Sequence, residues 1–91
     1  MRKSLMRMTL RQLQVFRSVC TNLSYSRAAE EMALTQPAVS LQIRQLEQFL
    51  QTRLVERTGR GIKATAAGET LLAHGERIQQ VVDDAIRAVN A

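Results

Sequence analysis

The sequence predicts a mainly α-helical fold with three short helices, a two-stranded β-hairpin and one long C-terminal helix. Only 3% of the residues are aromatic although 45% are hydrophobic, so the core is built from Leu, Val, Ile, Ala and Met, as in packed helices. Apolar residues recur at helical spacings of three and four along most of the chain. A Gly-Arg-Gly sequence at 59–61 interrupts this periodicity between two short strand-like segments.

The chain length and the charge distribution limit the kinds of function. At 91 residues the chain can form one domain with a modest core, and we expect no small-molecule ligand pocket in it. Residues 1–65 carry eleven Lys or Arg against four Glu, a net charge of +7, whereas residues 66–91 carry two Arg against four acidic residues. This pattern indicates a polyanionic partner, nucleic acid or acidic lipid, for the first part and a different role for the second.

The first helix is predicted over residues 10–21. Thr9 and Gln12 have the spacing of a capping box, which closes the N-terminus of a helix. Val15 and Val19 form a second apolar edge, which either extends the core or packs on another helix or subunit. The main apolar face should point to the core, and it consists of Leu10, Leu13, Phe16 and Cys20.

Turn residues at 22–25 separate this helix from a short second helix, predicted over residues 27–32 with Ser26 as its N-cap. Two adjacent small residues on this helix permit close contact with a neighbouring helix. The side chains expected to face inward are Ala28, Ala29 and Met32.

The third helix is predicted over residues 36–50, with Thr35 as its N-cap and Pro37 in its first turn, where the missing N–H costs nothing. A stripe only about 60° wide must face the core, because helical residues are 100° apart. This stripe comprises Val39, Ile43, Leu46 and Leu50. The opposite surface is rich in hydrogen-bonding groups and suits a nucleic-acid groove, and it comprises Pro37, Leu41, Arg44 and Gln48.

The segment 54–65 predicts a β-wing with strands at 54–57 and 62–65 and a turn at 58–61. Arg60 lies between two glycines at the tip of this hairpin. Its guanidinium can therefore extend away from the body of the domain.

Thr65 is expected to cap a last helix that runs to about Asn90, which is too long for a 91-residue globule to bury. The four-and-three spacing of apolar and small residues along this helix is typical of a seam with a partner helix. The seam would consist of Leu71, Gly75, Ile78, Val82, Ala85 and Val89, with backbones approaching closely at Gly75. Alternatively, Leu71 and Leu72 pack on the chain's own core and the rest is an exposed amphipathic helix.

Several classes of function lack the residues they require. Cys20 is the only cysteine and His74 the only histidine, so no intrachain disulfide or Cys/His zinc site can form, and we expect Cys20 to be a small buried hydrophobe. No paired carboxylates, nucleophile motif or phosphate-binding Gly loop indicates an enzyme, and no cofactor is expected.

The N-terminus lacks the apolar run of a signal peptide, and no segment approaches the length of a membrane span. We therefore expect a cytoplasmic protein without a membrane partner. Residues 1–8 are expected to be a flexible basic arm or a leader added for expression.

Two helices joined by a tight turn and followed by a basic hairpin constitute a winged helix-turn-helix, expected here over residues 9–65. The sequence RAAEEMALTQPAVS at 27–40, continued by QIRQLE at 42–47, resembles the signature of LysR-type transcriptional regulators. LVER at 54–57 with Arg60 resembles the wing of that family, and TAAG at 65–68 resembles the start of its linker helix. Within the family, LTQPAVS and LRQLQ at 10–14 look most similar to regulators of Calvin-cycle (RuBisCO) operons.

The resemblance implies sequence-specific binding of double-stranded DNA by a bacterial regulator whose effector domain is absent from this chain, with RNA polymerase as a candidate partner of the longer parent protein. Residues 66–91 would be the linker helix, which pairs, typically antiparallel, in a homodimer on a pseudo-palindromic site. The third helices enter successive major grooves, where base contacts are expected from Gln36, Pro37, Ala38, Ser40, Leu41 and Gln42. Contacts to the DNA backbone or minor groove are expected from Ser26, Arg27, Thr35, Arg44, Arg57 and Arg60.

The sequence departs from the family at four positions. Leu41 stands where many members have Arg, and it either contacts a thymine methyl group or is an ordinary exposed Leu. Gln51 stands where Gly is usual, Val55 replaces the common Phe and Ala64 a common Leu, which predicts somewhat looser packing of the wing.

Two other functions fit less of the sequence. A helical protein-interaction module with a basic docking surface leaves the wing and Leu41 unexplained. A non-specific RNA-binding protein needs aromatic stacking platforms, which three scattered aromatic residues do not supply.

Overall fold

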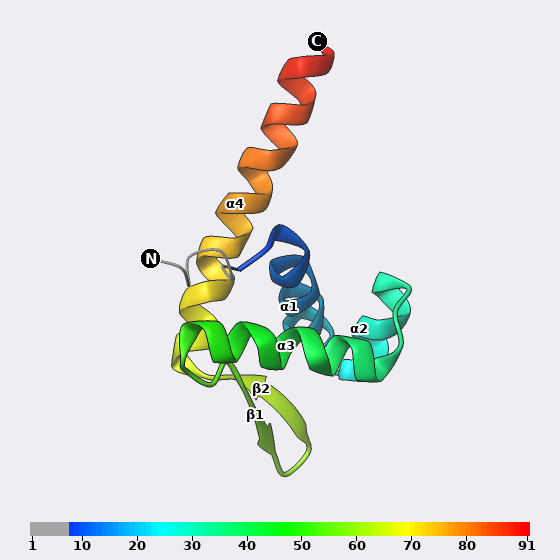
Figure 1. The fold of residues 1–91 in the computed structure, drawn as a ribbon, viewed down its shortest axis with the longest axis vertical. Coiled ribbons are helices and arrows are strands. Elements are labelled where there is room, and N and C mark those ends of the chain that lie inside the picture. Colours follow the sequence, from blue (N-terminus) through cyan, green and yellow to red (C-terminus); the bar gives the residue numbers. More distant parts are fainter. Residues whose placement is uncertain (1–7) are drawn as a thin grey trace.

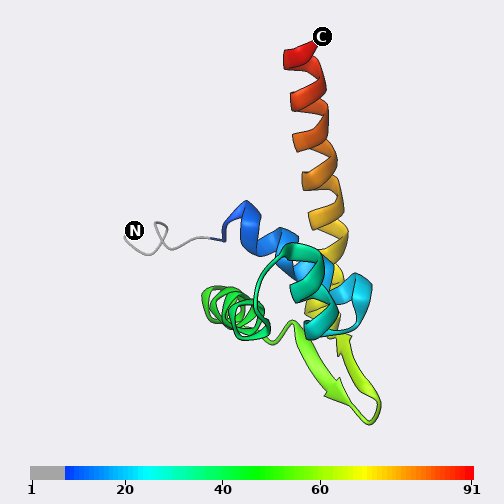
Figure 2. The ribbon, with the colours of Figure 1, turned by 90° about the vertical axis from the view of Figure 1, so that its right-hand side faces the viewer.

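The computed structural model describes residues 8–91, which form four helices and one two-stranded antiparallel sheet (Figure 1). In chain order the elements are α1 (Leu10–Asn22), α2 (Tyr25–Met32), α3 (Gln36–Leu50), β1 (Val55–Thr58), β2 (Gly61–Ala64) and α4 (Ala66–Asn90). The first three helices pack together, the hairpin projects from them on one side, and α4 extends away on the other (Figure 1, Figure 2). This is the predicted winged helix-turn-helix with a long terminal helix.

The basic arm expected at residues 1–8 lies outside the described residues except for Met8, which is half-buried against the core. Within residues 8–91, no helix combines the length and the apolar character that crossing a membrane requires.

Side-chain caps begin the helices, as predicted for α1, α3 and α4. The capping box of α1 is present, because Thr9 Oγ1 accepts from the Gln12 amide at 3.0 Å and Gln12 Oε1 accepts from the Thr9 amide at 3.0 Å. Thr35 and Thr65 cap α3 and α4 by accepting from the backbone amides three residues later.

The predicted N-cap of α2 is wrong. Ser24, not Ser26, accepts from the backbone amide of Arg27 at 3.1 Å, and the helix begins at Tyr25. The earlier start brings the Tyr25 ring onto the core, where its side chain is half-buried. Hydrophobic burial thus selects between two serines that are equally able to cap.

The core lies between α1, α2, α3 and the base of the hairpin. Val15 and Val19 are fully buried in it, so the second apolar edge of α1 belongs to this chain's own core. Leu10 and Leu50 were expected to face inward but are exposed, because they lie at helix ends beyond the packed segments. Cys20 is half-buried against the core, and burial raises its pKa to about 11, so the thiol stays protonated.

The turn of the hairpin is shorter than predicted, because β1 begins and ends one residue later than expected and β2 one residue earlier. Val55 pairs with Ala64 and Thr58 with Gly61, which leaves Gly59 and Arg60 as a two-residue turn. Leu54 precedes β1 and is buried in the core. Arg60 is at the tip of the hairpin, as predicted.

The first half of α4 packs on α1. Gly75 is buried, and a Cβ built on it would lie 3.1 Å from Leu13 Cδ1. The close approach expected at Gly75 is therefore to α1 of the same chain. Two polar contacts accompany it: Gln14 Nε2 donates to Gln79 Oε1 at 3.3 Å, and Arg17 Nη2 lies 3.7 Å from Glu76 Oε2.

Helix α3 ends in a left-handed residue that is not glycine, since Gln51 has φ 55°. A Cβ in this region costs about 1–2 kcal/mol, and glycine raises the entropy of the unfolded chain by about 0.4–1 kcal/mol. Because the Gln51 side chain is exposed, Gln51→Gly should raise the free energy of unfolding by about 0.5–1 kcal/mol in urea unfolding. Gln48→Gly, at an exposed position inside α3, should lower it by about 1 kcal/mol. Equal destabilisation by both variants would contradict a strained cap.

Candidate nucleic-acid interface

Helix α3 and the hairpin enclose a polar hollow of about 370 Å³. Gln36, Ser40 and Arg44 line it from α3, and Arg57 lines it from β1. These four side chains were predicted DNA contacts, and the structure brings them together. The remaining lining residues are Tyr25, Ile43, Glu47, Arg53, Val55, Glu56 and Ile62.

The hollow carries unneutralised positive charge. Within residues 8–91, no ion pair is formed by Arg44 and Arg57, which line the hollow, or by Arg60 at the hairpin tip. The two carboxylates at the hollow are already engaged: Glu47 accepts from backbone amides, and Glu56 Oε2 lies 3.6 Å from Lys63 Nζ. Free guanidinium groups beside neutralised carboxylates suit phosphate oxygens.

The outward side of α3 presents polar and apolar groups next to each other. Gln36 Nε2 donates to Ser40 Oγ at 3.1 Å, which holds the amide along the first turn of the helix. Pro37 is exposed, and Leu41 is 46% exposed on the side of α3 away from the core. The Gln36 amide and the exposed Pro37 and Leu41 side chains together match the mixed chemistry of base edges in a major groove.

Four of the predicted base contacts do not line the hollow, namely Pro37 and Leu41 on the exposed side of α3, and Ala38 and Gln42. Ala38 and Gln42 are half-buried, and each lies two residues from Ser40 along the helix. Because that separation corresponds to 200° of rotation, both residues are on the flank of α3 away from the hollow.

The other predicted backbone contacts are spread around the rim of this surface. Ser26 and Arg27 are exposed at the start of α2, but Arg27 lies beside Glu30 and Glu31 around a separate depression. Thr35 Oγ1 already accepts from the Ala38 amide at 3.2 Å. Of these residues, Arg27 has the least favourable electrostatic surroundings for a phosphate.

Sequence reasoning missed Tyr25 and Arg53 at the hollow. Tyr25 was assigned to a turn, and its place appears only once α2 is seen to begin there. Burial is the main cause that raises its pKa, and the nearby Glu47 carboxylate adds to it against the effect of Arg57 and Arg53. The hydroxyl therefore stays protonated at neutral pH and remains a hydrogen-bond donor.

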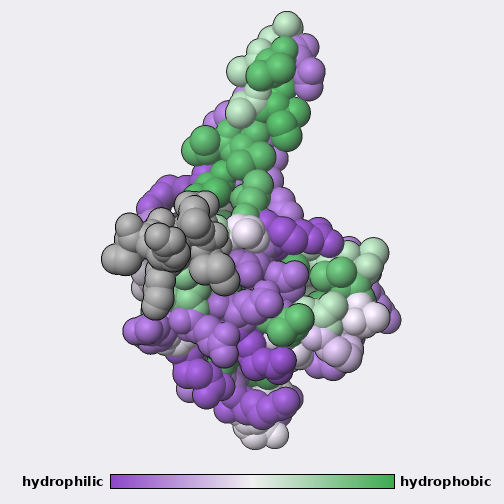
Figure 3. All heavy atoms as spheres, viewed as in Figure 1, coloured by the Kyte–Doolittle hydropathy of each residue, from purple (hydrophilic) through white to green (hydrophobic). Residues whose placement is uncertain are grey.

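A second surface lies along α4, where Figure 3 shows a hydrophobic strip above the hydrophilic surface of α3 and the hairpin. Among the predicted seam residues, Ile78, Ala85 and Val89 are exposed, Val82 is half-buried, and Leu71 packs with Leu72 against the core. Val81 and Ile86, which were not predicted, are 65% and 55% exposed on the same helix. Ile78, Val81 and Val82 line a shallow groove with His74 and Arg77.

The chain is similar in sequence to known bacterial regulators. Residues 10–69 match the family described as bacterial regulatory helix-turn-helix proteins, lysR family. The chain is 49% identical over 82 residues to the HTH-type transcriptional regulator CbbR of Rhodospirillum rubrum, over 90% of this chain and 28% of that protein. It is 47% identical over 75 residues to the RuBisCO operon transcriptional regulator of Allochromatium vinosum, over 82% of this chain and 25% of that protein. The chain thus spans about a quarter of the length of these relatives, which are transcriptional regulators and not enzymes.

Solved structures share the fold. The BenM_DBD/benA site 1 DNA complex superimposes with a TM-score of 0.87 at 31% identity, over 91% of this chain and 93% of that chain. The CbnR_DBD-DNA complex superimposes with a TM-score of 0.81 at 34% identity, over 92% of this chain and 100% of that chain. Both neighbours are complexes with DNA. The resemblance inferred from the sequence motifs, including the similarity to RuBisCO operon regulators, is confirmed.

Proposed function

Since the chain belongs to the LysR family of bacterial regulatory helix-turn-helix proteins and has the fold of its DNA-binding domains, we propose that it binds a pseudo-palindromic site in double-stranded DNA as a homodimer. The hollow between α3 and the hairpin is the observation that supports this proposal most strongly. It combines unpaired guanidinium groups with the outward polar and apolar surface of α3. That combination serves both phosphate contact and base recognition.

In this proposal α3 enters the major groove. Gln36 hydrogen-bonds an adenine, and Leu41 contacts a thymine methyl group. Pro37 and Ser40 complete the central contact surface, with Ala38 and Gln42 at its flank. Phosphate or minor-groove contacts come from Arg44, Arg57 and Arg60, with Ser26, Arg27 and Thr35 at the periphery.

The winged helix-turn-helix of residues 9–65 and the linker helix of residues 66–91 have separate roles in this proposal. The exposed apolar strip of α4, with Ile78 and Val81 near the middle of the helix, pairs with the same strip of a second copy. Pairing places two α3 helices on one face of DNA, as a pseudo-palindrome requires.

The names of the relatives indicate which DNA this chain binds. Because they include regulators of RuBisCO operons, we propose promoter DNA of such an operon as the natural ligand, bound in the cytoplasm. RNA polymerase would be a partner of the longer parent protein.

Fluorescence anisotropy tests the proposal with a pseudo-palindromic duplex from a RuBisCO operon promoter and a scrambled duplex of equal composition, each at 50 and 200 mM salt. Binding should be tighter on the promoter duplex and weaken steeply with salt on both. Equal affinity for both duplexes would contradict sequence-specific recognition of this target. Absence of binding at both salt concentrations would contradict DNA binding itself.

Gln36→Ala should weaken binding to the promoter duplex about tenfold, because a bidentate amide–adenine contact is worth about 1–3 kcal/mol. Binding to the scrambled duplex should not change. Gln80→Ala is the matched control, since Gln80 is an exposed glutamine on α4, outside α3 and the hairpin. An equal loss on both duplexes would show that Gln36 does not read a base.

A further inference from the structure

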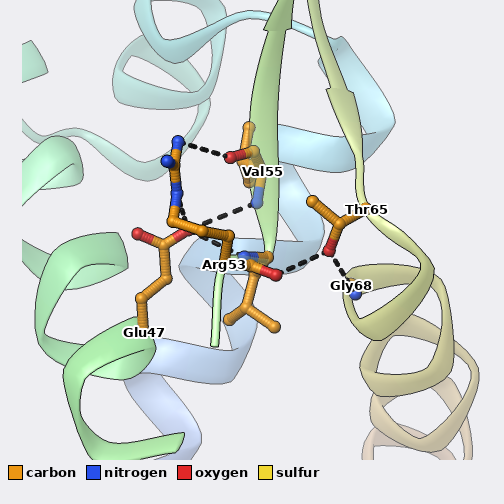
Figure 4. A network of polar contacts seen from close by, with 6 residues as sticks. Glu47, Arg53, Val55, Thr65 and Gly68 are labelled. Atoms are coloured by element: carbon orange, nitrogen blue, oxygen red, sulfur yellow. Dashed lines mark hydrogen bonds and ion pairs between the residues drawn. The ribbon is translucent and has the colours of Figure 1, made fainter. Parts of the chain in front are cut away.

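We propose that Glu47 is a positioning residue that fixes the direction of the hairpin relative to α3, and thereby the reach of Arg57 and Arg60. The inference rests on the proposed function, in which the hairpin contacts DNA. Glu47 lies in the last turn of α3, and its side chain is only 16% exposed. Its Oε2 accepts from the backbone amides of Leu54, at 2.8 Å, and Val55, at 3.3 Å (Figure 4).

The main chain of Glu47 also binds the segment that connects α3 to β1, at the end of this segment next to α3. Its carbonyl accepts from the amides of Gln51 and Thr52, the latter at 3.2 Å. Arg53 Nη2 donates to the Val55 carbonyl at 3.1 Å, and Arg53 Nε lies 3.6 Å from Glu47 Oε2. Because Arg53 is 72% exposed, this ion pair contributes little, and the two backbone amides are the principal partners of the carboxylate.

The start of α4 holds the other side of the same segment. Thr65 Oγ1 donates to the Arg53 carbonyl at 2.6 Å and accepts from the Gly68 amide at 3.0 Å (Figure 4). The Thr65 amide donates to the Leu54 carbonyl at 3.0 Å. The beginning of β1 is therefore bound between the end of α3, through Glu47, and the beginning of α4.

Because the hairpin is held only at its base, a small rotation there displaces its tip by a larger distance. An isolated two-stranded hairpin is at best marginally stable, so its direction is set where it joins the body. Arg60 is five residues beyond Val55, which corresponds to about 17 Å along an extended strand. A rotation of only about 10° at the base would move the tip by about 3 Å, enough to break a hydrogen bond to a phosphate oxygen.

Glu47→Met tests the inference, because methionine is about as long as glutamate but offers no oxygen to the Leu54 and Val55 amides. Glu56→Met is its matched control, because Glu56 belongs to the same hollow but pairs with Lys63 across the strands. Removing a negative charge beside DNA should by itself strengthen binding, so Glu56→Met should bind at least as tightly as the wild type. Glu47→Met should instead bind about tenfold more weakly, because the hairpin loses its direction. Binding by Glu47→Met as tight as by the control would overturn the inference.

A double-mutant cycle with Arg60→Ala measures positioning directly. In the wild type, Arg60→Ala should lower the slope of log affinity against log salt by about one unit. In the Glu47→Met background it should lower that slope by less than half a unit, because Arg60 no longer reaches the phosphate. A full unit in both backgrounds would overturn the inference, since a purely structural role of Glu47 leaves the Arg60 contribution unchanged.

Amide hydrogen exchange in the free protein separates this inference from the proposed function. The Leu54 and Val55 amides should exchange at least tenfold faster in Glu47→Met than in Glu56→Met, while core amides such as that of Leu46 stay unchanged. Unchanged exchange at Leu54 and Val55 would overturn the inference whatever the DNA data show. Faster exchange, together with an Arg60→Ala variant that binds DNA like the wild type, would support hairpin positioning and contradict the proposed DNA contact of Arg60.

Discussion

Gly68→Ala should lower the free energy of unfolding by about 3 kcal/mol or more. A Cβ at this position would lie 2.2 Å from the Leu54 carbonyl oxygen, 3.1 Å from the Leu54 carbonyl carbon and 3.2 Å from Ala64 Cβ. Two of these neighbours are backbone atoms in the segment that joins α3 to the hairpin, and they cannot move aside as a flexible side chain can. Alanine gains about 1 kcal/mol of helix propensity, which is too little to compensate.

Thermal unfolding measures this effect. With about 4–8 °C per kcal/mol for a domain of this size, the Tm should fall by at least about 12 °C. Gly75→Ala is the control within the same helix, because its added Cβ would meet the flexible Leu13 side chain at 3.1 Å instead of backbone. It should change stability by less than about 1 kcal/mol, since the helix-propensity gain offsets a small side-chain shift. Comparable losses in both variants would argue against the backbone contact at Gly68 as the cause.

The fold could be predicted from local signals because they agree with the tertiary contacts. The capping box at Thr9 and the threonine caps of α3 and α4 place three helix starts correctly. Where two candidates compete locally, as Ser24 and Ser26 do, only burial of the Tyr25 ring decides. Packing of this kind is not encoded in any short segment.

The composition of the candidate interface was predictable in part. Gln36, Ser40, Arg44 and Arg57 were expected from helix periodicity and family motifs, and they do meet at one hollow. The roles of Arg53 and Glu47 depend on how the chain turns between α3 and β1, which sequence spacing does not specify. The function of Gly75 was likewise ambiguous, because close backbone approach looks the same in a sequence whether the partner is α1 or a second subunit.

The dimer seam is the part of the proposal that a single substitution tests most severely. Val81→Asp should raise the dissociation constant of the homodimer more than 100-fold, which corresponds to about 3 kcal/mol. Val81 is 65% exposed in one chain and lies near the middle of α4. In a two-fold antiparallel pair, residues near the middle of the helix face their own copies, so two carboxylates would be buried together without partners.

Gln80→Asp is the matched control, because it introduces the same charge one residue away, where the exposed side chain points to the opposite side of α4 from the apolar strip. Sedimentation velocity should show the control as a dimer and Val81→Asp as a monomer with unchanged helix content by circular dichroism. DNA affinity should fall for Val81→Asp alone, since two half-sites can then no longer be bound by one preassembled pair. A Val81→Asp variant that still sediments as a dimer would refute pairing along this strip, and α4 would then be an amphipathic helix whose apolar strip serves another contact.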